Sequence, residues 1–505
     1  MISQSLLRKN IVFGYAAQAV TMASVFFLSV ALVRLLSKSD FGAYNLINSL
    51  ILVLGAVCSL GLESTTSRYI SEFLSRNELT KVNRIFLRSL VIRAAALGTC
   101  CLAIFLFSEQ LTELLNLPPA IMVSLAVIMG VFVLNQLRPV VGAAPLQGYL
   151  ETYKNSSNVI VYQLLRLVLF ILVLVMGYGL TGLFLTWLVV EALSLMAYTG
   201  QVAPKLIYNS RNGDAQQVTK SDLNRFDRYA WHMYISQSLL VFTTVAIDNF
   251  VIAHYLPYES IAEYSLAAGL VLMIGNVNPI LVMRGLITNV MVREYAVTGD
   301  RQKLSRNYST WVKLILFAML PLYMVFVLYI DKIISIVYSP EYLSIIPVAL
   351  TLVGFFVFRE INQAFSPIIL ATETTWILVL ASMFSVYNLV MDIVLVPRFG
   401  IMGAAIATGS AFFFLFIYFT FMLRKTAGCP IVFPLLGATK VAVNLLPMVG
   451  IGLLMREVIS GLASLLLAIL VTLLGYLLSS IVFKVFSDEE RERMQRLLGT
   501  KFFMF

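Results

Sequence analysis

The sequence predicts an all-α polytopic membrane protein with about 14 transmembrane helices, arranged as two parallel-repeat six-helix bundles around a central cleft plus two extra C-terminal helices. Three observations predict this fold class: the composition, the length of the apolar runs, and an internal repeat. Apolar residues make up 60% of the 505 residues and charged residues only 12%, against about 45–50% and about 25% in soluble proteins. This composition excludes a soluble enzyme, a disordered chain and a secreted disulfide scaffold. The apolar runs are also continuous, which disfavours a β-barrel, whose strands alternate apolar and polar residues over roughly 10 positions.

Runs of about 20 mostly apolar residues, the length that crosses a bilayer as a helix, define the elements in order. There are fourteen such runs, which span 11–33, 41–62, 85–107, 119–141, 159–177, 181–203, 229–253, 261–289, 309–330, 345–365, 376–396, 401–423, 438–455 and 461–483. The thirteenth is the weakest, because Pro447 interrupts it. The predicted domains are an N-terminal bundle over 1–203, a cytoplasmic linker over 204–228, a C-terminal bundle over 229–423, two further spans within 424–483 and a cytoplasmic tail over 484–505. In the tail, Ser487-Asp-Glu-Glu490 has the capping-box pattern of a short surface helix.

The distribution of lysine and arginine predicts the orientation in the membrane. With the N-terminus in the cytoplasm, about 30 of the 36 basic residues fall on the cytoplasmic side, whereas the outer side carries Arg34, Lys38, Lys332, Arg398 and Arg456. Arg8 and Lys9 run directly into the first span with no small-residue cleavage site, which indicates a retained first helix. We therefore expect a multi-pass protein of the cell inner membrane with both termini cytoplasmic. The net charge of +10 is explained by this topology, so nucleic acid is not expected as a partner.

The residues with reactive side chains predict no cofactor, no metal site and no enzyme activity. Cys58, Cys100, Cys101 and Cys429 lie in or beside apolar runs without metal-ligand spacing, so we expect them to be small buried apolar residues. The sequence contains no Gly-x-x-x-x-Gly-Lys-Ser/Thr loop for ATP, no His-Glu-x-x-His and no Gly-x-Ser-x-Gly.

An internal repeat at an offset of about 220 residues predicts the two-bundle arrangement. The matches are Leu36, Tyr44 and Gly55 with Leu256, Tyr264 and Gly275, then Gly179-Leu-Thr-Gly182 with Gly400-Ile-Met-Gly403, and Pro145 and Glu151 with Pro367 and Glu373. Six spans separate equivalent points, and because six is even, both copies have the same orientation in the membrane. Such a repeat has a pseudo-two-fold axis along the membrane normal, and rocking of the two bundles gives alternating access, which is typical of a transporter.

A resemblance to a known family rests on motifs that follow the first two spans. The chain has Val33-Arg34-Leu-Leu-Ser-Lys-Ser-Asp40-Phe41-Gly42-Ala-Tyr44 after the first and Gly61-Leu-Glu-Ser-Thr-Thr-Ser-Arg68-Tyr69-Ile-Ser-Glu72 after the second. With the repeated Gly-x-x-Gly motifs and the fourteen-span layout, these resemble the Wzx-type oligosaccharide-lipid flippases of the multidrug/oligosaccharidyl-lipid/polysaccharide (MOP) exporter superfamily. The resemblance covers essentially the whole chain. It implies an inner-membrane flippase that moves an undecaprenyl-pyrophosphate-linked oligosaccharide to the outer leaflet for O-antigen, capsule or exopolysaccharide assembly. It also implies membrane lipids, a proton or sodium gradient and polysaccharide assembly proteins as partners.

Three other functions are weighed against this one. A multidrug/cation antiporter of the same superfamily usually has twelve spans and lacks the Ser-x-Asp-Phe-Gly signature. A membrane glycan polymerase or glycosyltransferase is expected to have a substantial outer loop, whereas the outer segments 108–118 and 331–344 are short. The resemblance to the lipid II flippase branch is poorer, because that branch has arginines in its first helix where this chain has Gln18, Thr21 and Ser24.

Charged residues inside the predicted spans are candidates for function, because a charge in a bilayer is costly. The basic candidates are Arg138, Arg166, Arg284 and Arg359, with Arg166 roughly 10 Å inside the membrane at 1.5 Å per residue. Guanidinium groups suit a pyrophosphate through permanently charged, bidentate hydrogen bonds. We therefore expect some of them to bind the pyrophosphate of the lipid, the alternative being snorkelling toward the headgroups.

The acidic candidates are Glu191, Asp248, Glu360 and Asp392, expected to serve in ion coupling or gating. Gln237, Thr244 and Asp248 are predicted to share one helix face, where Asp248 could take up a proton or sodium ion; the alternative is hydrogen bonding between helices. Arg359 and Glu360, being adjacent, are expected to point apart and to need separate partners. By the repeat offset Glu360 corresponds to Arg138, and these two are candidates for a gate across the pseudo-axis. Asn278-Pro279 in the eighth span is a candidate hinge, or a packing kink.

Overall fold

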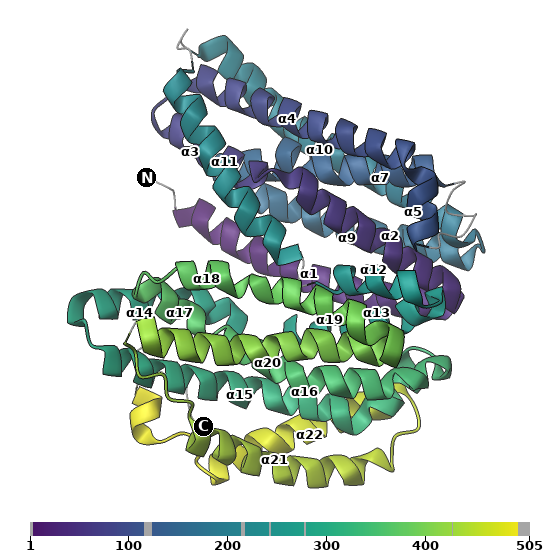
Figure 1. Ribbon diagram of the computed structural model, residues 1–505, viewed down its shortest axis with the longest axis vertical. Coiled ribbons are helices and arrows are strands. Elements are labelled where there is room, and N and C mark those ends of the chain that lie inside the picture. Colours follow the sequence, from purple (N-terminus) through teal and green to yellow (C-terminus); the bar gives the residue numbers. More distant parts are fainter. Residues whose placement is uncertain are drawn as a thin grey trace. The chain divides into compact units, whose positions relative to one another are not determined.

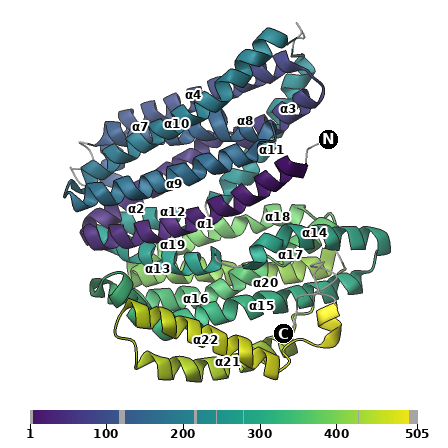
Figure 2. The same cartoon turned by 180° about the vertical axis from the view of Figure 1, so that it is seen from behind.

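The computed structural model describes residues 4–115, 124–213, 218–241, 244–276, 279–426 and 428–492, and every regular element in these ranges is a helix. The chain forms two compact units, Met1–Ala262 and Glu263–Phe505. Figures 1 and 2 show the helices of each unit from opposite sides. The prediction of an all-α fold is confirmed over the described residues.

The N-terminal unit is built from the first six spans and the two helices that follow them. Its elements are α1 (Gln4–Leu35), α2 (Lys38–Ser59), α3 (Leu62–Ser75), α4 (Leu79–Leu106), α5 (Ser108–Leu115), α7 (Leu125–Arg138), the π-helical turn η1 (Pro139–Ala143), α8 (Ala144–Gly148), α9 (Thr152–Val175), α10 (Gly179–Asn212), α11 (Lys220–Val241) and α12 (Val245–Tyr255). α9 packs between α1 and α10, and α10 packs on α7. α13 (Tyr258–Asn276) crosses the boundary between the units.

The C-terminal unit contains the remaining helices. They are α14 (Pro279–Thr298), α15 (Arg301–Lys332), η2 (Ile333–Val337), η3 (Pro340–Ile345), α16 (Ile346–Asn362), α17 (Phe365–Ala371), α18 (Trp376–Ala381), α19 (Met383–Phe399), α20 (Ile401–Thr426), α21 (Leu435–Arg456) and α22 (Leu462–Val482). α20 packs on both α16 and α19, while α21 and α22 pair with each other and with α15.

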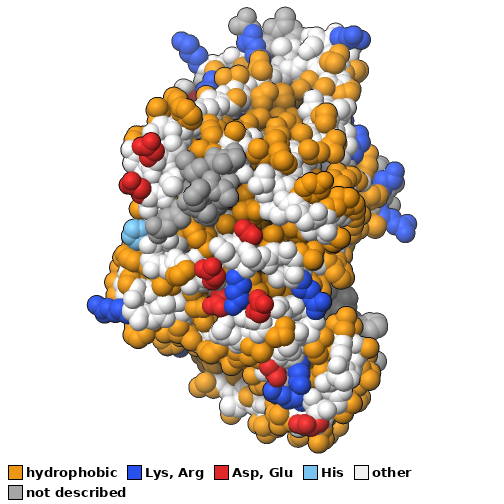
Figure 3. Space-filling view, turned by 90° about the vertical axis from the view of Figure 1, so that its right-hand side faces the viewer, with side chains coloured by type: hydrophobic (Ala, Val, Ile, Leu, Met, Phe, Trp, Pro, Cys, Tyr) orange, Lys and Arg blue, Asp and Glu red, His pale blue; other side chains and the backbone are white. Residues whose placement is uncertain are grey.

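Twelve helices in the described ranges are long and apolar enough to cross a membrane, and each coincides with a predicted span. The predicted spans 229–253 and 261–289 are not among them. In the former the helix is not continuous, because Thr244 has an extended backbone (φ −101°, ψ 154°) and caps the start of α12. Outward-facing side chains of the spans are apolar, as for Leu466 and Leu470 of α22, and hydrophobic side chains cover much of the face drawn in Figure 3. Contact with lipid accounts for this exposure.

The sequence repeat recurs in the helix ends. α1 ends at Leu35 and α2 begins at Lys38, and 220 residues later α12 ends at Tyr255 and α13 begins at Tyr258. Gly179, the first residue of α10, and Gly400, just before α20, have nearly the same positive φ, 58° and 60°, a conformation that glycine adopts without strain.

The turns after α8 and α17 are also equivalent. Leu150 and Glu373 both have positive φ, 61° and 55°. Around each, the backbone makes the same three hydrogen bonds, for example Glu151 N to Leu146 O and Thr374 N to Ile369 O. The repeat therefore includes matching backbone turns, in which Glu373 corresponds to Leu150, one position from its predicted match Glu151.

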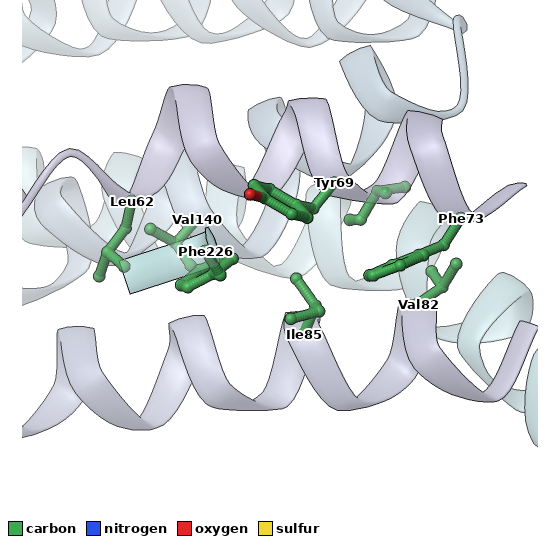
Figure 4. Close-up of a cluster of buried hydrophobic side chains, with 8 residues drawn as sticks. Leu62, Tyr69, Phe73, Val82, Ile85, Val140 and Phe226 are labelled. Carbon is green, nitrogen blue, oxygen red and sulfur yellow. The ribbon is translucent and has the colours of Figure 1, made fainter. Parts of the chain in front are cut away.

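α11 and α12 belong to the N-terminal unit, although the sequence predicts them in the C-terminal bundle. α12 packs on α2, and α11 packs on α3. Phe226 of α11 is fully buried in a hydrophobic cluster with Leu62, Tyr69 and Ile85, which Figure 4 shows between α3 and α4. Arg88 of α4 adds an ion pair of 2.8 Å to Asp227 of α11.

The second span bends where α2 ends. Leu60 and Gly61 both have positive φ, 46° and 64°, so the helix stops and restarts as α3. A Cβ at Gly61 would collide with the Ala230 carbonyl of α11. Gly61 is thus required both by its backbone conformation and by the close approach of α11.

Candidate functional site

A buried polar cluster lies inside the N-terminal unit, between α7, α9 and α10. Its centre is Glu191 of α10, whose side chain is fully buried. Glu191 Oε1 accepts hydrogen bonds from Asn135 Nδ2 at 2.9 Å, from the Tyr162 hydroxyl at 2.7 Å and from Trp187 Nε1 at 3.1 Å. Glu191 Oε2 accepts from Arg138 Nη1 at 3.2 Å. Both carboxylate oxygens therefore have donors, as a carboxylate inside a membrane protein requires.

Three helices position these donors. Asn135 and Arg138 are one turn apart on α7, and Trp187 and Glu191 are one turn apart on α10, so each pair lies on one helix face. Tyr162 comes from α9, and the Arg138 guanidinium lies over its ring, 4.2 Å from the centroid. Arg138 is therefore held by a carboxylate and an aromatic face together.

Arg166, one turn from Tyr162 on α9, is held differently. Its Nη2 donates to the Tyr44 hydroxyl of α2 at 2.7 Å. Its guanidinium lies 4.9 Å from the ring centroid of Trp187 and 5.1 Å from that of Phe170. Among the described residues, no carboxylate lies within 4.0 Å of it. Arg166 is thus an oriented cation in a predicted span, with aromatic faces and one neutral acceptor in place of an ion partner.

A chain of hydrogen bonds extends the cluster to α4. Gln136 Nε2 donates to Asn135 Oδ1 at 3.0 Å, and Arg93 Nη2 donates to Gln136 Oε1 at 2.8 Å. The buried Arg93 also donates to the backbone carbonyls of Gln136 and Cys58. Arg93 therefore joins α4 to α2 and α7.

Sequence reasoning found three of the charged members of this cluster and missed Arg93 and the neutral ones. Glu191, Arg138 and Arg166 were predicted site residues, and the structure brings them together. Tyr44, Asn135, Tyr162 and Trp187 were not predicted. A usable signal was the polar run Asn135-Gln136-Leu-Arg138 inside an otherwise apolar span.

A second pair of predicted residues meets in the C-terminal unit. Arg359 Nη1 donates to Glu360 Oε1 at 2.7 Å, and Gln363 Nε2 donates to Glu360 Oε2 at 2.7 Å. The expectation that Arg359 and Glu360 point apart was wrong: they lie in the last turn of α16, where long side chains can fold back. Gly275 of α13 makes room, since a Cβ there would lie 3.0 Å from both charged groups.

The two gate candidates have ion partners within their own units. Arg138 pairs with Glu191, and Glu360 pairs with Arg359. The gate between Arg138 and Glu360 stays a prediction.

Asp248 and Asp392 are buried, with exposures of 1% and 0%. Asp248 is in the first turn of α12, where the helix dipole favours a negative charge. The expectation that Thr244 and Asp248 share a helix face was wrong, because Thr244 is the extended N-cap residue of α12. The side chain of Gln237 lies outside the described residues. Asp392 lies on α19, on the same buried face as Asn388 and Ser385.

Three further predicted positions fall outside the described residues. Asn278 is one, and the side chains of Pro279 and Arg284 are the others, although both belong to α14. The hinge prediction and the proposed role of Arg284 therefore stay predictions. In the part of the chain that the structure describes, no group of three or more His, Cys, Asp or Glu residues could hold a metal ion.

Two further ion pairs hold acidic residues that lie outside the membrane spans. Glu151, in the turn between α8 and α9, accepts from Lys205 at 2.8 Å and lies 2.9 Å from Lys154. Burial raises the pKa of Glu151, but the hydrogen bonds from the two lysines outweigh it and hold the pKa below its usual range. Glu490 makes a comparable pair with the buried Lys313.

Residues 31–347 match the sequence model of a family described as polysaccharide biosynthesis protein. The chain belongs to this polysaccharide biosynthesis family. The Glu191 cluster and Asp248 lie within the matched residues, whereas Arg359, Glu360 and Asp392 lie beyond them.

Comparison with known proteins shows the fold of this chain. The chain is 22% identical over 411 residues to an uncharacterized membrane protein of Methanocaldococcus jannaschii, covering 77% of this chain and 78% of the other. A lipid II flippase, MurJ, in an inward closed conformation superposes with a TM-score of 0.72 at 15% identity, covering 94% of this chain and 98% of that one. An inward-facing multidrug resistance MATE family transporter of the MOP superfamily gives 0.62 at 14% identity, covering 81% and 96%. The fold is therefore that of MurJ and MATE transporters.

Proposed function

We propose that this protein is a flippase for an undecaprenyl-pyrophosphate-linked oligosaccharide, moving it from the cytoplasmic to the outer leaflet of the inner membrane by alternating access. The observation that carries the proposal is Arg166, a guanidinium within a membrane span that has no carboxylate within 4.0 Å among the described residues. A permanent cation in a low-dielectric region favours an anionic cargo. A pyrophosphate meets this need, because it brings two or more negative charges and several acceptor oxygens.

Arg138 is the second candidate for the pyrophosphate. Its guanidinium gives one hydrogen bond to Glu191, and its side chain is 24% exposed, so further donors remain for a ligand. Arg359 is likewise paired with one carboxylate, that of Glu360, and its side chain is 29% exposed. We assign Arg166 the leading role because binding there breaks no existing ion pair.

The alternative is a cation antiporter of the same superfamily, whose cargo needs an acidic site. Glu191 and Glu360 each have an arginine partner, which favours an anionic cargo over a cationic one. Asp248 remains our candidate for proton or sodium coupling, since it is buried at the start of a helix.

The proposal is tested by reconstituting the protein in vesicles with a fluorescent undecaprenyl-pyrophosphate oligosaccharide and measuring its appearance in the opposite leaflet. We expect Arg166→Ala to abolish this movement. Arg398→Ala, which removes an exposed arginine at the end of α19, should transport as the wild type does. Equal transport by Arg166→Ala, or transport of organic cations in place of the lipid, would refute the proposal.

A further inference from the structure

Away from the Glu191 cluster, a groove runs along the N-terminal unit between α4 and α11. Its larger part has a volume of about 440 Å³ and is lined by Arg84, Leu87, Arg88 and Val91 of α4 and by Leu223 of α11. Its smaller part, of about 160 Å³, extends along α11 past Ala230 and Trp231. Ile92 lines both parts, so they adjoin.

The groove follows the faces of two helices. The lining residues recur at helical spacing on both helices. They are residues 84, 87, 88 and 91 on α4 and residues 223, 227, 230 and 234 on α11. Between Leu223 and Tyr234 the groove is therefore about 16 Å long, at 1.5 Å per residue. This is the shape of a channel for an extended hydrocarbon chain rather than for a compact solute.

The groove is open and apolar. Leu87, Val91 and Trp231 are 58%, 59% and 59% exposed. Because α4 has the length and composition of a membrane span, the molecules that meet Leu87 and Val91 are lipids. Apolar pockets of this size with a few polar groups at one end are typical ligand sites.

Positive charge lies at one end of the groove. Arg84 is exposed and has no ion partner among the described residues. One turn further along α4, Arg88 Nη2 donates to both oxygens of Asp227, at 2.9 Å and 2.8 Å, so this second arginine is neutralised. The end of the groove thus carries a net positive charge at Arg84, next to an apolar channel.

We propose that this groove binds one anionic glycerophospholipid of the surrounding bilayer, with its phosphate on Arg84 and an acyl chain along Leu87 and Val91 toward Trp231. The charge of Arg84 matches the headgroup, and the length and apolar lining of the channel match the chain. The site does not involve Arg166, so it is independent of the cargo proposed above.

The quenching of Trp231 fluorescence by brominated lipids provides the measurement. Trp187 and Trp311 are 2% exposed, whereas Trp231 and Trp376 are exposed, so Trp376→Phe leaves Trp231 as the exposed tryptophan. This variant is placed in phosphatidylcholine vesicles in which a fraction of either phosphatidylglycerol or phosphatidylcholine has brominated acyl chains. We expect brominated phosphatidylglycerol to quench the fluorescence of Trp231 at about a fivefold lower mole fraction than brominated phosphatidylcholine does. This is the preference expected from one arginine at the membrane surface.

Two pairs of variants test the two ends of the site. Arg84→Gln should lose the preference for phosphatidylglycerol, whereas Lys9→Gln, which removes an exposed cation on α1, should keep it. Val91→Phe should reduce quenching by filling the channel, whereas Val168→Phe, at a valine of equal exposure (58%) on α9, should not.

Equal quenching by the two lipids, an unchanged preference in Arg84→Gln, or unchanged quenching in Val91→Phe would each overturn the proposal. Displacement of phosphatidylglycerol by a far smaller fraction of undecaprenyl phosphate would also overturn it, because the groove would then belong to the carrier lipid of the cargo.

Discussion

Arg166 of α9 donates a 2.7 Å hydrogen bond to the hydroxyl of Tyr44 on α2, and this bond is the polar contact that orients its guanidinium. Tyr44 is itself buried, with its ring 5.9 Å from that of Trp187. The cation is therefore positioned by a neutral acceptor that leaves its charge available for a ligand.

Tyr44→Phe should weaken transport without unfolding the protein. The ring and its packing remain, but the acceptor for Arg166 is lost, and hydrogen bonds to charged groups contribute about 1.5–3 kcal/mol. We expect about a tenfold fall in lipid transport by a protein that stays folded, with an unfolding temperature modestly lower than that of the wild type. The matched control is Tyr162→Phe, which also removes a tyrosine hydroxyl, but one that donates to Glu191. A wild-type rate in Tyr44→Phe would show that this bond does not position Arg166.

Glu191→Ala should strongly destabilise the N-terminal unit. It removes a fully buried carboxylate and leaves Arg138, Asn135, Tyr162 and Trp187 without their acceptor. Breaking a buried ion pair costs about 3–5 kcal/mol, which a fall in the unfolding temperature in detergent would report. The double variant Glu191→Ala/Arg138→Ala should recover part of the loss. An unchanged unfolding temperature in Glu191→Ala would contradict the central place given to this carboxylate.

Variants of Arg359 test the ion pair between Arg359 and Glu360. Arg359→Ala removes the cation that is paired with the buried Glu360, so we expect lower stability and lower transport together. Arg359→Lys should restore stability and only part of the transport, since lysine cannot bind bidentately. If Arg359→Ala kept full transport in the vesicle assay, a role for Arg359 in cargo binding would be excluded.

Asp248→Asn tests the proposed ion coupling. The amide preserves the size of the side chain but can neither bind a proton nor carry a charge. We expect transport that no longer responds to an imposed proton or sodium gradient, while downhill movement of the lipid continues. Gradient dependence equal to that of the wild type would remove Asp248 from the coupling mechanism.

The pair between Glu490 and the buried Lys313 gives a pH dependence of stability. Burial raises the pKa of Glu490, but the hydrogen bonds from Lys313 and from the Ser487 backbone outweigh it, and the pKa is lowered. A lowered pKa means that the stabilisation is complete above the unfolded value of about 4.3 and is lost as the pH falls through the folded value. The gap in unfolding temperature between wild type and Glu490→Gln should therefore be constant from pH 7 to 5 and shrink below about pH 4.

Glu489→Gln is the control for this experiment, because Glu489 is the exposed neighbour of Glu490. It should leave the unfolding temperature nearly unchanged at every pH. If the difference in unfolding temperature between wild type and Glu490→Gln widened on acidification, the stabilising pairing of Glu490 with Lys313 would be contradicted.

Helix placement could be predicted from the sequence because each span is a continuous apolar run. Twelve predicted spans coincide with helices, and the repeat matches at Leu36/Leu256 and Gly179/Gly400 fall at equivalent helix ends. The capping box of the tail is also present, with Ser487 N donating to Glu490. The bond from Lys313 to Glu490 could not be predicted, because the two lie 177 positions apart in the chain.

The break before α12 was missed because nothing in the apolar pattern around Thr244 forbids a helix. The pairing of Arg138 with Glu191 was missed for another reason: it depends on how α7 packs against α10, and composition does not encode that register. Arg359 with Glu360 shows a third limit, since helical periodicity places Cβ atoms but not the ends of long side chains. Sequence reasoning thus found some of the charges, missed the buried Arg93 and Lys313, and could not assign partners.

The most direct test of the account is the binding of an undecaprenyl-pyrophosphate oligosaccharide to the purified protein, measured for the wild type, Arg166→Ala and Arg398→Ala. We predict that Arg166→Ala weakens binding by about 10–100-fold, as expected for a lost charge-assisted contact, while Arg398→Ala binds normally. The same comparison with undecaprenol, which lacks the pyrophosphate, should show no difference among the three proteins. Wild-type affinity of Arg166→Ala for the pyrophosphate lipid would contradict the claim that this arginine holds the cargo.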